Sequence, residues 1–185
     1  MILLLSIIFR NLTIYMISRK VILTGSFGVG KTSLFRRFIK GTFSEKYITT
    51  IGVKVDKKVV EIKGEEVSIL LWDIAGEVRQ DKVPKSFFLG ASAIIYVFDL
   101  TRPSTYKNIG VDMKILNDIL PNAIIKVVGN KEDLIVKEGT DNVMDIVALD
   151  KIKKEVGIPI DATTSAKTGD NVEQLFSNLA EEFIV

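Results

Sequence analysis

The chain has 185 residues, a length that fits one domain with a full hydrophobic core. A hydrophobic fraction of 47% and a charged fraction of 26% are typical of a globular protein, and a formal net charge of +2 argues against nucleic acid as a partner. Cysteine and histidine are both absent, which excludes disulfides, cysteine-based zinc sites, thiol nucleophiles and imidazole general bases.

The N-terminal extension, residues 1–15, is strongly apolar and precedes the domain that we expect over residues 16–185. Arg10 and Asn11 interrupt its apolar run, so it lacks the roughly 18 or more apolar residues of a transmembrane helix, and no basic residue precedes Ile2 as in a secretory signal. Three interpretations stay open: an unused upstream start with translation from Met16, a membrane-seeking segment, or an extension packed on the core. We expect a cytoplasmic protein, with peripheral membrane contact only if residues 1–17 are translated.

The segment Gly25–Thr32, which we call the phosphate loop, reads GSFGVGKT and fits the pattern G-x-x-x-x-G-K-[ST]. The run Val21–Thr24 predicts a buried strand before it, and Ser33–Lys40 predicts a helix after it whose N-terminus favours anions. Its glycines allow successive amides to point at phosphate oxygens, Lys31 can reach the β- and γ-phosphates, and the hydroxyl of Thr32 can ligate Mg²⁺. The alternative is a glycine-rich turn that fits the pattern by chance, but such a turn would not need a buried strand before it and a helix after it.

Strand and helix patterns alternate through the rest of the chain. Polar residues 42–50 predict a surface loop, and a hairpin is predicted around Lys63 and Gly64. The predicted strands are Val53–Ile62, Glu66–Trp72, Ala91–Leu100, Ala123–Gly129 and Ile158–Thr163. The predicted helices are Tyr106–Leu120, Val147–Val156 and Asn171–Phe183. This alternation is typical of a three-layer α/β domain, in which ligands bind at the carboxyl ends of the strands.

Three further polar motifs follow predicted strands. Asp73 is suited to hold Mg²⁺ through water, and the Gly76 amide can approach a γ-phosphate. Asp133 can accept two hydrogen bonds from the N1 and N2 donors of guanine, a pair of donors that adenine lacks. The backbone amide near Ala166, within Ser165–Lys167, can meet guanine O6. Each motif alone also fits a polar turn, but four motifs in order at strand ends favour a nucleotide site over coincidence.

From about Arg19 to Val185 the chain resembles a Ras-superfamily small GTPase, most closely of the Rab branch. The resemblance rests on GSFGVGKT, on the segment Tyr47–Val53, and on WDIAG, GNKEDL and TSAKTGDNVEQLF. It implies the α/β fold of P-loop NTPases, a three-layer sandwich with a six-stranded, mostly parallel sheet and five helices. It also implies a molecular switch that binds GTP or GDP with Mg²⁺ and hydrolyses GTP to GDP and phosphate.

The resemblance further implies roles for single residues. Thr50 matches a threonine that ligates Mg²⁺ and contacts the γ-phosphate. Tyr47 matches an aromatic residue that closes over the phosphates. Phe43 matches an aromatic residue that packs edge-on to guanine, or is a loop residue packed on the core. The implied catalytic residues are Lys31, Thr50, Gly76 and Glu77, and the implied Mg²⁺ ligands are Thr32, Thr50 and Asp73. The implied nucleotide-binding residues are Phe27, Gly28, Val29, Gly30, Lys31, Thr32, Ser33, Phe43, Tyr47, Asn130, Lys131, Asp133, Ser165, Ala166 and Lys167. Effectors and regulators are implied at residues 43–53 and 73–88. Val55, Trp72 and Phe87 match a Rab-like effector triad or pack in the core.

Two departures from the family pattern concern hydrolysis. Glu77 stands where the family has a glutamine that orients the attacking water, and an ionised carboxylate only accepts hydrogen bonds and is repelled by the γ-phosphate. We therefore expect slow intrinsic hydrolysis, unless another residue such as Gln80 orients the water.

Phe27 stands where the family has a small residue over which a partner's arginine passes, and its ring should obstruct that approach. Arg36, Arg37 and Arg79 are candidates for an arginine from the chain itself, or are surface charges.

A third departure is the absence of cysteine near Val185, so we expect no prenylation, which fits a prokaryotic member of the family.

The leading hypothesis for the function is a GTP-hydrolysing switch. The alternative is a GTP-bound scaffold with negligible hydrolysis, which Glu77 and Phe27 favour. An adenine-nucleotide kinase is a more distant hypothesis, because Asn130, Lys131 and Asp133 argue against it.

Overall fold

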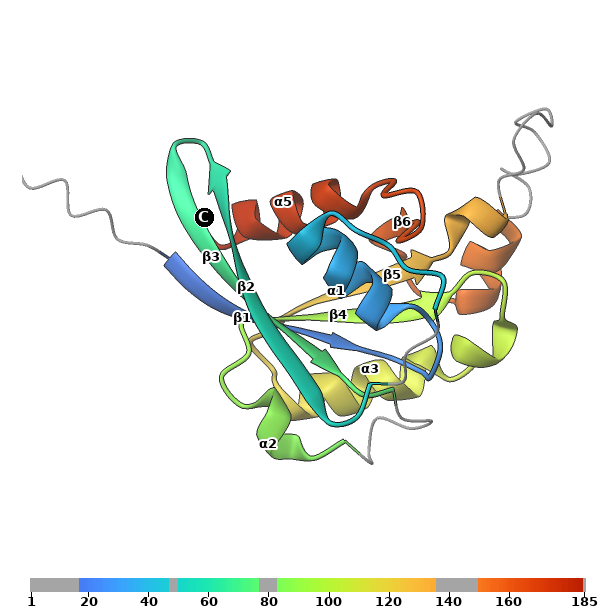
Figure 1. Cartoon of the computed structure of the whole chain (residues 1–185). Coiled ribbons are helices and arrows are strands. Elements are labelled where there is room, and N and C mark those ends of the chain that lie inside the picture. The colour runs from blue at the N-terminus through green and yellow to red at the C-terminus, as the bar shows by residue number, and fades with distance from the viewer. Residues whose placement is uncertain (1–16, 47–49, 77–82, 136–149, 185) are drawn as a thin grey trace, which may run out of the picture.

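The structure is a computed structural model and describes residues 17–46, 50–76, 83–135 and 150–184. Figure 1 shows a twisted central sheet with helices on both faces. The six strands are β1 (Ile17–Thr24), β2 (Val53–Ile62), β3 (Glu65–Ile74), β4 (Ala93–Asp99), β5 (Ile124–Asn130) and β6 (Ala162–Thr164). Their order across the sheet is β2-β3-β1-β4-β5-β6, and β2 runs antiparallel to β3 while the remaining pairings are parallel. The predicted α/β sandwich with a mostly parallel sheet is confirmed.

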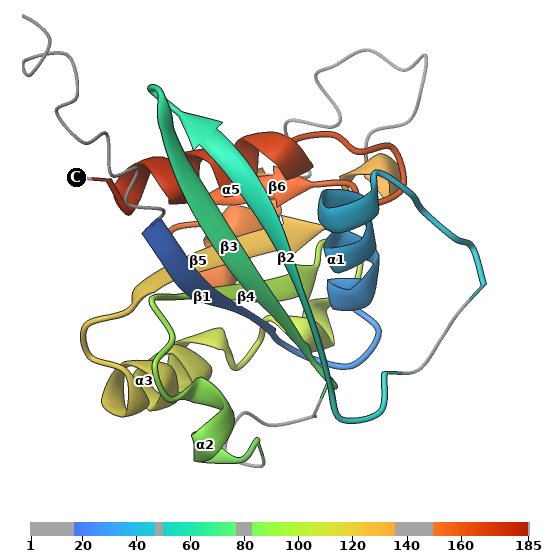
Figure 2. The ribbon, with the colours of Figure 1, turned by 60° about the vertical axis from the view of Figure 1, so that its left-hand side comes forward.

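The helices form two outer layers. Those on one face are α1 (Lys31–Lys40) and α5 (Val172–Glu182); those on the other are α2 (Lys85–Phe88), α3 (Ile109–Ile119) and the helical residues 150–156 (Figure 2). Short 3₁₀ turns, η2 (Pro103–Thr105) and η3 (Glu132–Leu134), follow β4 and β5. These turns lie at the carboxyl edge of the sheet, where a ligand site is expected.

Strand β4 shows how one segment serves both layers. Every residue of β4 is buried, and its side chains alternate between the two hydrophobic clusters. Ile95 and Val97 pack with α1 and α5, whereas Ile94 and Phe98 pack with α2 and α3. A strand that is apolar on both faces requires helices on both sides, which is why the sequence reads as a continuous apolar run.

The layer formed by α1 and α5 is closed by an aromatic pair. The rings of Phe38 and Phe176 stack with centroids 3.7 Å apart and an interplanar angle of 15°. Lys58 on β2 adds an ammonium 4.4 Å from the Phe38 ring centroid and an ion pair of 2.6 Å to Glu173. These contacts hold α1, and with it the phosphate loop at its N-terminus, against the sheet.

Most predicted element boundaries differ from the structure by only a few residues. Strand β6 starts at Ala162 rather than at Ile158, and β1 starts at Ile17 rather than at Val21. Helix α3 starts at Ile109 rather than at Tyr106, because Pro103–Thr105 forms a 3₁₀ turn. Within the described part of the chain, no helix is both long and apolar enough to cross a membrane.

Candidate functional site

The phosphate loop joins β1 to α1 and needs glycine at two positions. Gly25 and Gly30 have φ values of +127° and +100°, which side chains rarely adopt. A Cβ atom would lie 2.1 Å from the carbonyl oxygen of Val97 at Gly25, and 2.2 Å from Nδ2 of Asn130 at Gly30. The loop is therefore packed directly against β4 and the end of β5, and only glycine fits there.

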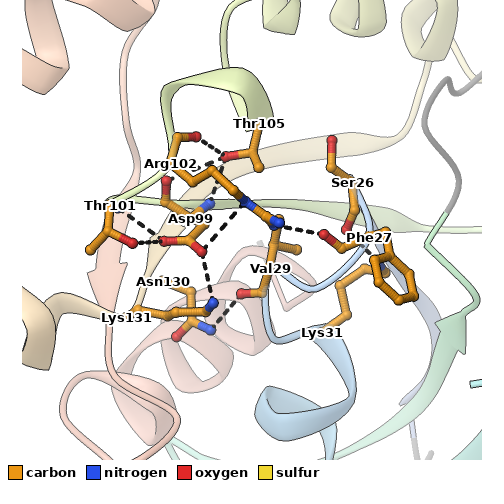
Figure 3. A network of polar contacts seen from close by, with 10 residues as sticks. All are labelled: Ser26, Phe27, Val29, Lys31, Asp99, Thr101, Arg102, Thr105, Asn130 and Lys131. Carbon is orange, nitrogen blue, oxygen red and sulfur yellow. Dashed lines mark hydrogen bonds and ion pairs between the residues drawn. The ribbon is translucent and has the colours of Figure 1, made fainter. Parts of the chain in front are cut away.

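Side-chain donors hold the carbonyl groups of the phosphate loop. Lys31 Nζ donates to the carbonyl oxygens of Gly25 at 2.8 Å and Ser26 at 2.9 Å. Asn130 Nδ2 donates to the carbonyl oxygen of Val29 at 2.9 Å (Figure 3). Because these carbonyl oxygens accept hydrogen bonds from side chains, the backbone N–H groups of the loop are the groups available to bind an anion at the N-terminus of α1.

Three oxygen-bearing side chains meet beside this loop. Thr32 Oγ1 lies 2.7 Å from Asp73 Oδ2 and 2.6 Å from Thr50 Oγ1, and Thr50 Oγ1 lies 3.5 Å from the same carboxylate oxygen. Asp73 is completely buried, and its other oxygen, Oδ1, has no hydrogen-bond partner among the residues that the structure describes. Burial raises the pKa of Asp73, although the Thr32 hydroxyl and the charge of Lys31 oppose that shift.

These groups are hard oxygen ligands with one unsatisfied buried carboxylate oxygen, which is the kind of donor set that Mg²⁺ prefers. The structure therefore brings together the three residues predicted as metal ligands. Gly76 lies next to them, since a Cβ atom there would be 2.6 Å from Lys31 Nζ and 2.8 Å from the Cα atom of Phe27.

The loops after β5 and β6 form the other half of the site. Ser165 Oγ donates to Asp133 Oδ1 at 2.6 Å, which orients that carboxylate. Asn130 Oδ1 accepts hydrogen bonds from the Ala166 amide and from Thr164 Oγ1, both at 3.2 Å. Asn130 is only 1% exposed, so its amide group ties the phosphate loop to both of these loops.

A cavity of about 280 Å³ runs between the two halves of the site. Of the residues predicted from the sequence, its lining contains Phe27, Gly28, Gly30, Lys31, Thr32, Ser33, Phe43, Thr50, Gly76, Asn130, Lys131, Asp133, Ala166 and Lys167. Val29, Asp73 and Ser165 are buried behind that lining. Tyr47 and Glu77 lie outside the described residues, as do Arg79 and Gln80.

Comparisons with known proteins agree with this arrangement. The model of the Ras family matches residues 20–184. The chain is 37% identical over 163 residues to the Ras-related protein SEC4 of Saccharomyces cerevisiae, an alignment that covers 88% of this chain and 73% of that protein. The chain belongs to the Ras family. It is a Rab-like small GTPase, a guanine-nucleotide-binding protein that hydrolyses GTP.

Two residues at the site of this small GTPase were missed by the sequence analysis. Asp99 ends β4 and is 2% exposed, and its Oδ2 atom lies 2.7 Å from Lys131 Nζ. Arg102, in the turn that follows, donates from Nη2 to the carbonyl oxygen of Phe27 at 2.6 Å. An aspartate directly after a buried apolar strand was the available signal for the first, whereas nothing in the spacing points to the second.

Of the arginines that the sequence suggested, Arg36 and Arg37 lie within the described residues. Arg37 donates from Nε to the carbonyl oxygen of Ala166 at 2.9 Å and also contacts those of Gly41 and Lys167, so it braces the loop after β6. Arg36 contributes to the lining of the cavity beside Phe43. In the described part of the chain, Arg102 is the arginine hydrogen-bonded to the backbone of the phosphate loop.

Proposed function

We propose that this small GTPase is a Mg²⁺-dependent switch that binds GTP and GDP in the cavity between the phosphate loop and the loops after β5 and β6. The observation that carries the proposal is the cluster of Thr32, Thr50 and Asp73 beside Lys31. Thr50 belongs to residues 43–53 and Asp73 to residues 73–88, so a group bound at this cluster would link both segments to the phosphate loop. Release of that group would uncouple them, which is the behaviour of a switch.

Thr32, Thr50 and Asp73 would hold the metal ion, which supplies charge neutralisation at the phosphate oxygens when bound. We expect Lys31 Nζ to exchange its two loop carbonyls for phosphate oxygens. The amides of the phosphate loop and of Gly76 would donate to the β- and γ-phosphates, and water would be the nucleophile, because hydrolysis of GTP transfers the γ-phosphoryl group to water. Catalysis then consists of positioning and electrostatic stabilisation.

Base selection is assigned to Asp133. Its carboxylate is oriented by Ser165 at 2.6 Å and faces the cavity that the phosphate loop also lines. Guanine offers two adjacent N–H donors to such a carboxylate, whereas adenine does not. Lys131 and Lys167 line the same part of the cavity and would pack against the base or ribose.

The experiment is a binding assay with fluorescent GDP and ADP, in the presence of Mg²⁺, on the wild type and Asp133→Asn. The wild type is expected to bind GDP and not to bind ADP. The variant should prefer xanthosine diphosphate, because an amide in place of the carboxylate matches the extra carbonyl of xanthine. Equal binding of GDP and ADP by the wild type would overturn the assignment.

Slow intrinsic hydrolysis is the second element of the proposal. Phe27 is 47% exposed and lines the cavity, so we expect its ring to obstruct a residue that approaches from a partner. The same observation favours a second candidate function, a GTP-bound scaffold with negligible hydrolysis. The nucleotide that co-purifies distinguishes the two: bound GDP supports the switch, and bound GTP after an overnight preparation supports the scaffold.

The surface proposed for effectors and regulators comprises residues 43–53 and 73–88. Ile51 is 94% exposed and Val55 is 44% exposed, and Val55 pairs with Trp72 across the β2–β3 ladder. Lys20 Nζ lies 3.9 Å from the Trp72 ring centroid and donates to the Phe87 carbonyl at 2.8 Å, which holds Trp72 and Phe87 in one patch. We further propose a cytoplasmic location, with membrane contact only through residues 1–17, which are almost entirely outside the described residues.

A further inference from the structure

Arg102 contacts the phosphate loop but does not line the cavity. Its Nη2 atom donates to the carbonyl oxygen of Phe27 at 2.6 Å (Figure 3). Phe27 and Gly28 both belong to the cavity lining, whereas Arg102 does not. The guanidinium therefore contacts the carbonyl oxygen of the Phe27–Gly28 peptide group from outside the cavity lining, to which both residues of that peptide belong.

The backbone of Arg102 is fixed to the end of β4. Its N–H donates to the carbonyl oxygen of Asp99 at 3.0 Å, and its carbonyl oxygen accepts a hydrogen bond from Thr105 Oγ1 at 2.7 Å. Asp99 Oδ1 in turn accepts from Thr101 N at 2.9 Å and Thr101 Oγ1 at 2.6 Å, and Asp99 Oδ2 lies 3.7 Å from Arg102 Nε. Asp99 is buried, so it gives the arginine a rigid base from which to reach the loop.

The contact determines which way one amide of the phosphate loop points. In a trans peptide the C=O and the following N–H point in opposite directions, so a donor that holds the Phe27 carbonyl outward directs the Gly28 N–H inward. No cis peptide is present among the described residues. Gly28 has a φ value of +73°, and the freedom of glycine allows this peptide plane to rotate at little cost unless something holds it.

We propose that Arg102 is a positioning residue of this small GTPase: it fixes the Phe27–Gly28 peptide so that the Gly28 N–H is aimed at the bound phosphates. Asn130 does the same for the Val29–Gly30 peptide through its hydrogen bond to the Val29 carbonyl. Lys31 holds the Gly25 and Ser26 carbonyls, but it is expected to leave them for the phosphates. With nucleotide bound, Arg102 and Asn130 are then expected, among the described residues, to keep the loop oriented.

The inference rests on the proposed function, because it requires a phosphorylated ligand in the cavity. It adds a residue for which neither the motifs of the chain nor the lining of the cavity indicates a role. It also connects the Asp99 cluster to the phosphate loop, in addition to the contacts of Asp99 with Thr101 and Lys131. Loss of the guanidinium should weaken the binding of any nucleotide that carries a β-phosphate, without affecting the choice of base.

The test compares Arg102→Met, which keeps the aliphatic stem and removes the donors, with Arg102→Lys, which keeps one charged donor. The matched control is Lys107→Met, which removes an exposed cation from the same segment. The dissociation rate of fluorescent GDP with Mg²⁺ should rise on the order of tenfold in Arg102→Met, since a hydrogen bond from a charged donor is lost. Arg102→Lys should recover most of that loss, and Lys107→Met should match the wild type.

A second readout is the amide resonance of Gly28 in ¹H–¹⁵N spectra of the GDP complex, which should move in Arg102→Met and return in Arg102→Lys. The preference for GDP over xanthosine diphosphate should be the same in all four proteins. A wild-type dissociation rate in Arg102→Met, or equal losses in the Met and Lys variants with matching drops in melting temperature, would overturn the inference. If the wild type itself binds no GDP, the proposed function fails, and that outcome is distinct from a failure confined to Arg102.

Discussion

At residue 77 the chain has a carboxylate, Glu77, where we expect GTP hydrolysis to need the uncharged amide of a glutamine. A glutamine donates to one oxygen while accepting from the attacking water, whereas the carboxylate of Glu77 only accepts. We expect the wild type to hydrolyse GTP at about 10⁻⁴ s⁻¹ or more slowly, which is at or below the unassisted Ras rate. Glu77→Gln should raise the single-turnover rate on the order of tenfold, because it removes the repulsion and restores a donor.

The matched control for this substitution is Glu61→Gln, which makes the same chemical change at an exposed position of β2. That variant should hydrolyse GTP at the wild-type rate, with γ-phosphate release measured in both. Identical rates in the wild type and Glu77→Gln would remove Glu77 as the cause of slow turnover and would favour another residue, such as Gln80, as the one that orients the water.

Among the elements, the turn η2 shows how one buried carboxylate organises a segment. Burial opposes ionisation of Asp99, but the hydrogen bonds from Lys131 and Thr101 outweigh it and lower the pKa of this carboxyl group. A lowered pKa in the folded state adds stability above the ordinary aspartate pKa of about 4, and that stability is lost as the pH falls through the folded-state value. Asp99→Asn should therefore lower the free energy of unfolding by about 1–3 kcal/mol at pH 7.

The difference between the wild type and Asp99→Asn should stay constant from pH 7 to pH 5 and shrink once the pH falls below about 4. Urea denaturation at a series of pH values measures it, with the exposed Asp118→Asn as the control for loss of a surface charge. A difference that does not change with pH would mean that the charge of Asp99 is not what holds the turn.

At the scale of the whole molecule, we expect the ligand to bind between the two halves of the site, so occupancy should be linked to global stability. A ligand that binds only the folded state stabilises it in proportion to the logarithm of its concentration over its dissociation constant. Adding EDTA to the GDP complex should lower the melting temperature by about 5–10 °C, because Thr32, Thr50 and Asp73 lose their shared partner. Asp73→Ala should show little response to EDTA, and an equal response in both proteins would argue that the ion binds elsewhere.

The fold class and most of the site could be predicted from the sequence, because the signals are local. Apolar runs and helical spacing identify buried strands and amphipathic helices, and the glycines of the phosphate loop are needed at positive φ whatever surrounds them. Asp73, Asn130 and Asp133 were found because each ends or follows a strand, and the carboxyl ends of parallel strands meet at one edge of a sheet.

The tertiary structure decided what those residues do to one another. Asn130, predicted as a nucleotide contact, is buried and braces the phosphate loop, because the strand order β1-β4-β5 brings residues distant in sequence within hydrogen-bond reach. Arg102 carries no local signal, since its contact with Phe27 depends on how a 3₁₀ turn aims one flexible side chain. Motif spacing records what a short segment can bind, whereas the direction of a single amide in that segment depends on contacts that only the packed chain creates.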